Sequence, residues 1–216
     1  MKAQALLSKD VEVRALRLLQ TKEGPSKGFL EIWTKVRSQT IEFVLNQPAT
    51  KRRLQDVRYA VVGADLRIDR VALRGKLPPR IGEVGIYDYD QNVLLVFAVD
   101  LRKGTLLKVE ERKGLQPPIT DAELQEAKSL ALADKAYRKL RKERSLGVNA
   151  FIARVSFLHD HPAFTHRVFT LTFWSGGKNA KRVGTAVVDL SDRKVLANAD
   201  DDVVLAATQH NVNEDQ

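Results

Sequence analysis

The segments FAVDLRKGTLL (97–107) and AVVDLSDRKVL (186–196) repeat one pattern, and this repeat decides the fold. Each segment has a short apolar run that ends in Asp-Leu, followed by four mostly polar residues and two aliphatic ones. A strand, a tight turn opened by an Asp side chain and a returning strand produce this pattern. Because the segments lie in different halves of the 216-residue chain, they predict two copies of one structural unit.

The first half of the chain predicts a helix followed by antiparallel strands. Apolar residues at roughly helical spacing indicate a helix within 4–20, for which Ser8 is a candidate N-cap. β-branched and aromatic residues then favour strands. We expect them over most of 29–45, in the second half of 57–73, as a hairpin over 83–99 that turns near 88–92, and over 105–110.

The second half begins with a capping box. Thr120 stands in the N-cap position and Glu123 three residues later, so each can satisfy a backbone N–H group of the other. Ile119 and Leu124 occupy the positions of a hydrophobic staple. These signals predict a helix from 121 to about 144 that Gly147 ends. Four strands follow, over 149–158, 165–174, 182–190 and 194–199.

This order of elements predicts an α+β fold in which each unit packs a helix on one face of an antiparallel sheet. We place the first domain at 1–114, the second at 115–207 and a flexible acidic tail at 208–216. In the strand expected over 149–158, alternating apolar residues at 151, 153, 155 and 157 indicate one inner face.

Composition excludes several classes of site. The chain has no cysteine, which rules out disulfides, zinc–thiolate sites and thiol nucleophiles. No apolar run approaches the ~20 residues of a membrane span. The sequence as written predicts a cytoplasmic protein, whereas removal of a signal peptide would make it periplasmic or secreted. The net charge of +9 makes anionic partners worth testing.

One segment resembles a known family. Residues 80–124 contain Val99-Asp100-Leu101, then Lys103-Gly104-Thr105, then Gln116-Pro117-Pro118-Ile119-Thr120. This order is similar to that of the small N-terminal domains of copper amine oxidases, and 187–204 resembles the end of the second such domain. The resemblance implies two tandem cystatin-like units, each with one helix against an antiparallel sheet. In that family these domains lie outside the catalytic domain and take no part in the chemistry.

The resemblance does not extend to catalysis. The family's quinone cofactor forms from a tyrosine in an Asn-Tyr-Asp/Glu motif, and none of the four tyrosines here follows an asparagine: Tyr59, Tyr87, Tyr89 and Tyr137. The sequence has no counterpart of the catalytic domain. We therefore expect no catalytic residue, no cofactor and no amine oxidase activity.

Three of the four histidines fall close together, at His159, His161 and His166. The first two have the H-x-H spacing that places side chains on one side of an extended segment, and His166 on a neighbouring strand could reach them. The alternative is a polar hairpin tip held by Pro162. A metal site at these three residues therefore stays a hypothesis.

A basic cluster closes the predicted helix at Arg138, Lys139, Arg141 and Lys142. These side chains could bind an anion such as a phosphate group, but basic residues are also favourable at a helix C-terminus. No nucleic-acid-binding signature accompanies them.

Three functions follow from these observations. The first is a non-catalytic interaction or scaffold protein whose partner is another protein or a second copy of itself. The second is a small-ligand binder or enzyme with a pocket between helix and sheet, an analogy from fold alone. The third is a basic nucleic-acid accessory protein, which rests on charge.

Overall fold

The computed structural model describes residues 27–67, 81–142, 146–176 and 180–198, and these form two compact units. The first unit comprises the described residues up to Asp88 together with Leu94–Arg112. The second comprises Tyr89–Val93 and the described residues from Lys113 onward. The helix expected within 4–20 and the tail expected at 208–216 lie outside the described residues. No helix in the described ranges is both long enough and apolar enough to cross a membrane.

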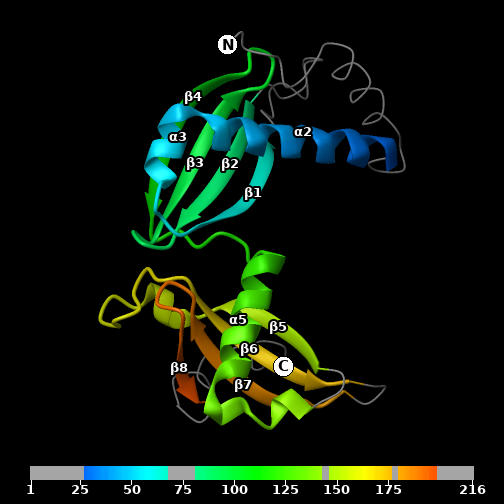
Figure 1. The fold of residues 1–216 in the computed structure, drawn as a ribbon, viewed down its shortest axis with the longest axis vertical. Coiled ribbons are helices and arrows are strands. Elements are labelled where there is room, and N and C mark those ends of the chain that lie inside the picture. Colours follow the sequence, from blue (N-terminus) through cyan, green and yellow to red (C-terminus); the bar gives the residue numbers. More distant parts are fainter. Residues whose placement is uncertain (1–26, 68–80, 143–145, 177–179, 199–216) are drawn as a thin grey trace, which may run out of the picture. The chain divides into compact units, whose positions relative to one another are not determined.

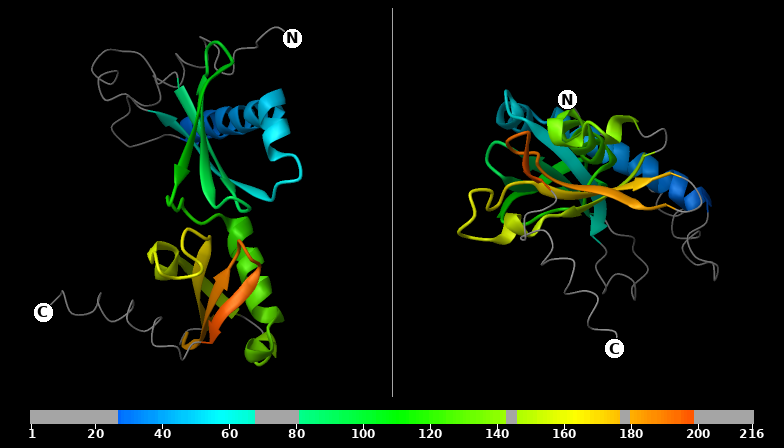
Figure 2. Two further views of the ribbon diagram at one scale, coloured as in Figure 1. Left: turned by 90° about the vertical axis from the view of Figure 1, so that its left-hand side faces the viewer. Right: turned by 90° about the horizontal axis from the view of Figure 1, so that it is seen from below.

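The first unit places two helices before a four-stranded antiparallel sheet (Figure 1). Figure 2 shows that the long helix α2 lies against one face of this sheet. The sheet has the simple order β1-β2-β3-β4. The elements are α2 (Lys27–Asn46), α3 (Pro48–Leu54), β1 (Tyr59–Arg67), β2 (Ile81–Asp88), β3 (Val93–Asp100) and β4 (Thr105–Lys113).

Helix α2 corrects the strand that the sequence predicts over 29–45. Val36, Thr40 and Val44 are buried at intervals of four residues, which forms one stripe along a helix. The Thr40 hydroxyl donates to the Val36 carbonyl at 2.7 Å, and its methyl group faces Gly82 of β2. Packing of this stripe against the sheet overrides the strand preference of the β-branched and aromatic residues.

The hairpin predicted over 83–99 is confirmed by β2 and β3, and the returning strand by β4. Asp100 ends β3, and its Oδ1 accepts the backbone N–H groups of Arg102 at 2.9 Å and Lys103 at 3.0 Å. Gly104 completes the turn with a positive φ of 58°. The core of this unit forms from one face of the central strands, at Val84, Ile86, Leu95, Phe97 and Val99.

The second unit packs one α-helix across a four-stranded antiparallel sheet of order β5-β6-β7-β8 (Figure 1). Ala127 and Ala131 of the helix are fully buried, as are Phe169, Leu171 and Phe173 of the sheet. The elements are α5 (Asp121–Ala133), η1 (Lys135–Tyr137), η2 (Leu140–Lys142), β5 (Leu146–Ile152), η3 (Arg154–Phe157), β6 (Val168–Ser175), β7 (Arg182–Asp189) and β8 (Lys194–Asn198).

The helix predicted over 121–144 ends earlier, at Ala133. The Asp134 side chain accepts the N–H of Ala136 and starts the short 3-10 turn η1 instead. Tyr137 is then buried, with its hydroxyl donating to the Thr185 carbonyl at 2.8 Å. Gly147, expected to end the helix, lies within β5.

The first strand of this sheet is also shorter than the predicted 149–158, because β5 ends at Ile152 and η3 follows. The inner face predicted from alternation is therefore wrong in part. Ala153 and Val155 are buried, but Phe151 and Phe157 are 64% and 51% exposed.

The two segments that share the Asp-Leu pattern form corresponding hairpins. Asp100 ends β3 and Asp189 ends β7, each the third strand of its sheet. The next strand begins five residues later in both cases. Leu101 and Leu190 are both fully buried. The predicted α+β architecture is confirmed.

Candidate functional site

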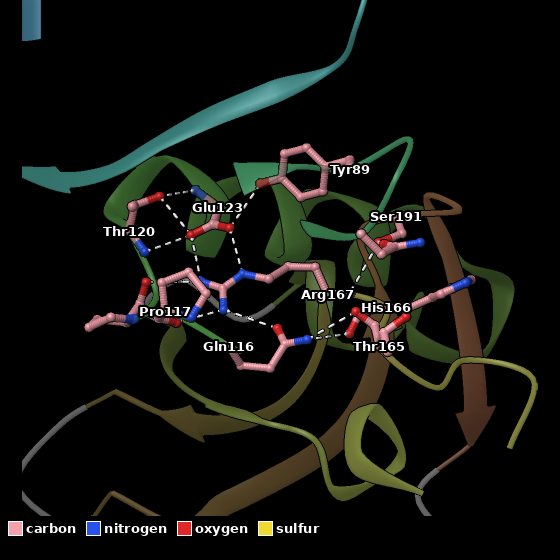
Figure 3. Close-up of polar contacts among 11 residues, drawn as sticks. Tyr89, Gln116, Pro117, Thr120, Glu123, Thr165, His166, Arg167 and Ser191 are labelled. Atoms are coloured by element: carbon pink, nitrogen blue, oxygen red, sulfur yellow. Dashed lines mark hydrogen bonds and ion pairs between the residues drawn. The ribbon is translucent and has the colours of Figure 1, made fainter. Parts of the chain in front are cut away.

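A fully buried arginine lies at the centre of the polar contacts in the second unit (Figure 3). Arg167 directly precedes β6, and all five of its guanidinium N–H groups have acceptors. Nε and Nη2 donate to the two carboxylate oxygens of Glu123 at 2.8 and 3.1 Å. Nη1 donates to the Pro117 carbonyl at 2.6 Å and to Gln116 Oε1 at 3.4 Å, and Nη2 also donates to the Pro118 carbonyl at 2.9 Å.

The Gln-Pro-Pro segment is suited to this role because it offers acceptors to the guanidinium and few competing donors. Pro117 and Pro118 have a carbonyl oxygen but no N–H group. The Gln116 side chain donates its own Nε2 to the carbonyls of Thr165 and His166, at 3.0 and 3.2 Å. The loop thus binds both the arginine and the residues before it.

Glu123 closes the network from the start of α5. The predicted capping box is confirmed: Thr120 Oγ1 accepts the Glu123 N–H at 3.2 Å, and the Thr120 N–H donates to Glu123 Oε2 at 2.9 Å. The Tyr89 hydroxyl donates to Oε1 at 2.8 Å. Ile119 and Leu124, expected as a hydrophobic staple, are both half-buried.

The pKa of Glu123 reflects two opposed effects. Burial alone would raise this pKa, but the hydrogen bonds and the charge of Arg167, with the bonds from Thr120 and Tyr89, lower it below the ordinary value of 4.5. Glu123 therefore stays ionised at neutral pH. Arg167 is 0% and Glu123 only 2% exposed, so the pair is closed to a substrate and serves to hold the unit together.

A second cluster lies beside the first, where His166 meets two aspartates. His166 Nδ1 is 2.8 Å from Asp189 Oδ2 and 4.0 Å from Asp192 Oδ2. Asp189 is fully buried, and its Oδ1 accepts the Asp192 N–H at 3.1 Å. Asp192 also pairs with Lys194 at 2.6 Å, which lowers the pKa of Asp192.

The structure thus gives His166 different neighbours from those that the sequence suggests. His161 Nδ1 accepts the Ala163 N–H at 3.0 Å, and the His159 ring packs on Phe164 with centroids 4.2 Å apart. Among the described residues, His166 joins Asp189 and Asp192 in a cluster of metal-ligand atoms, and His159 and His161 are not part of it.

Two of the predicted anion-binding residues lie between the short turns η1 and η2, and the other two lie on η2. All four side chains are exposed: Arg138, Lys139, Arg141 and Lys142. Arg141 donates to the carbonyls of Leu132 and Ala133, so it caps the C-terminus of α5. The other three remain available to an anion on the surface.

The first unit has a shallow depression of about 370 Å³ over β2, β3 and β4, lined by Glu83, Val96, Ala98, Lys108, Glu110 and Arg112. Hydrogen bonds from Lys108 and Arg112 lower the pKa of Glu110 to about 2. Glu110 therefore stays ionised near neutral pH.

Strand β5 forms an outer edge of the second sheet. Its seven residues, LGVNAFI, include no charge, and Gly147, Asn149 and Phe151 are its exposed positions. Phe151 is 64% exposed. By contrast, the outer strand β4 of the first sheet has charged side chains along its second half.

No protein-family model matches the sequence, and no curated protein matches it.

Proposed function

We propose that the chain is a non-catalytic interaction or scaffold protein made of two cystatin-like units, similar to the small N-terminal domains of copper amine oxidases. Support for the units comes from the helix that precedes each four-stranded antiparallel sheet. The corresponding hairpins at Asp100 and Asp189 add to it. The observation that carries the interaction is the uncharged outer strand β5 with its exposed Phe151.

Outer strands present unpaired backbone groups and usually have charges that prevent association. Strand β4 follows this rule with Lys108, Glu110, Glu111, Arg112 and Lys113. Strand β5 has no charged side chain within its described residues, Leu146–Ile152. It also exposes a large aromatic side chain, the residue type enriched where proteins meet. An added strand would pair with its backbone and cover Phe151.

The partner that this edge fits is a second copy of the chain. Two β5 strands related by a two-fold axis at Asn149 form an antiparallel pair in which Phe151 lies opposite Gly147 of the other copy. An aromatic ring covers such a glycine well because no side chain competes for the space. The pairing also brings no like charges together within the strand, although each chain has a net charge of +9.

Sedimentation velocity over a range of protein concentrations tests this function. We expect a concentration-dependent dimer that Phe151→Lys weakens at least tenfold, or about 1.4 kcal/mol. Leu107→Lys is the matched control, because Leu107 is 53% exposed on β4 and the substitution adds the same charge. A wild-type chain that stays monomeric at all concentrations contradicts the proposal, as does equal weakening by both substitutions.

Ionic strength separates this proposal from nucleic-acid binding. Salt screens the repulsion between two chains of +9, so self-association should strengthen between low and physiological salt. Binding of the basic residues near Arg138 to a phosphate backbone would instead weaken steeply over the same range.

A further inference from the structure

We propose that His166, Asp189 and Asp192 bind one divalent transition-metal ion, for which Zn²⁺ is the probe. Imidazole nitrogen and carboxylate oxygen are established ligands of this ion. The three ligand atoms lie within 4.8 Å of one another. This site does not depend on the interaction at β5, since the two involve different residues.

The two separations from His166 suit a shared ion after small side-chain rotations. With Zn²⁺ at about 2.0–2.2 Å from each ligand, tetrahedral geometry separates ligand atoms by about 3.4 Å. His166 Nδ1 is now 2.8 Å from Asp189 and 4.0 Å from Asp192, so one separation must widen and the other must shorten by about half an ångström. Metal binding at Nδ1 requires the tautomer of the neutral imidazole that carries its single proton on Nε2, so the ring loses no net proton.

The fold fixes the orientation of the Asp189 carboxylate and leaves His166 and Asp192 partly exposed to solvent. Asp189 is fully buried, and the Asp192 N–H holds its Oδ1, which turns Oδ2 toward His166. The His166 side chain is 20% exposed and that of Asp192 is 44% exposed. An ion can therefore reach the site from solvent, and water can supply the fourth ligand.

The corresponding hairpin of the first unit shows which residues the turn itself needs. There Asp100 accepts the N–H groups of Arg102 and Lys103, and the residue three positions after the aspartate is a lysine. The same position in the second unit holds Asp192. The turn thus forms without a second carboxylate, so the hairpin does not require the Asp192 side chain.

Lys194 allows a test in which a substitution should strengthen metal binding instead of weakening it. Its Nζ pairs with Asp192 Oδ2 at 2.6 Å, and this ion pair must break before a metal can take the same oxygen. Removal of the lysine charge should therefore tighten metal binding. An ion that binds elsewhere on the chain would not respond in this way.

Isothermal titration of the full chain with Zn²⁺ at pH 7 decides the proposal. We expect one ion per chain, at least tenfold weaker binding in His166→Gln and in Asp192→Ala, and tighter binding in Lys194→Met. His159→Gln is the matched control and should leave the affinity unchanged. Because Asp192 and Lys194 are exposed, these two variants keep the test valid if His166→Gln does not fold.

Three results would overturn the site. One is the absence of saturable binding by the wild-type chain. Another is an affinity that Asp192→Ala and Lys194→Met both leave unchanged. The third is equal loss in His159→Gln and His166→Gln, which would assign the ion to the histidine cluster that the sequence suggests.

Discussion

Replacing Arg167 with methionine should be among the most damaging single substitutions in the second unit. The change removes all five donors of a fully buried side chain and leaves the Glu123 carboxylate without its counter-charge. The carbonyls of Pro117 and Pro118 lose their partner as well. Breaking a buried pair on one side costs about 3–5 kcal/mol, chiefly through the charge left behind. We expect that loss in the free energy of unfolding at pH 7.

The loss of unfolding free energy in Arg167→Met should depend on pH, because Glu123 can be protonated. In the wild type the pKa of Glu123 lies below 4.5, so the ionised pair stabilises the fold above that pH, and the contribution disappears as pH falls through the folded pKa. Without Arg167, burial acts largely unopposed and raises the pKa of Glu123. Protonation of Glu123 then removes the unpaired buried charge from the variant. The difference in free energy of unfolding between the wild type and Arg167→Met should therefore become smaller between pH 7 and pH 4.

Urea unfolding followed by tryptophan fluorescence measures this difference. Trp33 lies in α2 and Trp174 in β6, so a Trp33→Phe background reports the second unit alone. At pH 7, Arg167→Met with Glu123→Leu should be less destabilised than Arg167→Met alone, because no buried charge remains. A loss below about 1 kcal/mol, or a difference that stays constant with pH, would refute this account of the pair.

The capping box and the tyrosine hydroxyl give two smaller effects in the same assay. Thr120→Ala should lower the free energy of unfolding by about 1 kcal/mol through loss of the α5 cap, and an unchanged value would show that Thr120 does not cap the helix. Tyr89→Phe should cost about 2 kcal/mol, since its hydroxyl donates to the ionised Glu123. Because Tyr89 belongs to the second unit, Trp174 should report this loss, and a loss reported by Trp33 alone would contradict that assignment.

The strands were predictable where local pattern and burial agree. The hairpin of β2 and β3 follows from apolar runs joined by a short polar turn, and this information lies within the segment itself. Helix α2 was not predicted from the sequence, because its β-branched and aromatic side chains favour strands. Only the spacing of Val36, Thr40 and Val44 indicates a helix. Packing against the sheet decided that conflict, and a single sequence gives no direct measure of it.

The residues of the candidate sites also differ in whether local sequence predicts them. Glu123 was predicted because a capping box has fixed local spacing, whereas its partner lies 44 residues further along the chain. The sequence did contain an indication that Arg167 is buried. Residues 167, 169, 171 and 173 alternate along one predicted strand, so their side chains lie on the same face of the sheet. Phe169, Leu171 and Phe173 on that face are fully buried. An arginine is almost never fully buried without a partner, so a buried Arg167 predicts a partner but does not say which of the 27 acidic residues it is.

The Gln-Pro-Pro segment has a structural role in the second unit. Its carbonyls bind the Arg167 guanidinium and its glutamine side chain binds the carbonyls beside that arginine. A motif that works through internal hydrogen bonds of this kind constrains how the helix and the sheet join. Because these groups are used up inside the unit, any activity must be argued from groups that solvent or a partner can reach, such as the edge at Phe151 and the cluster at His166.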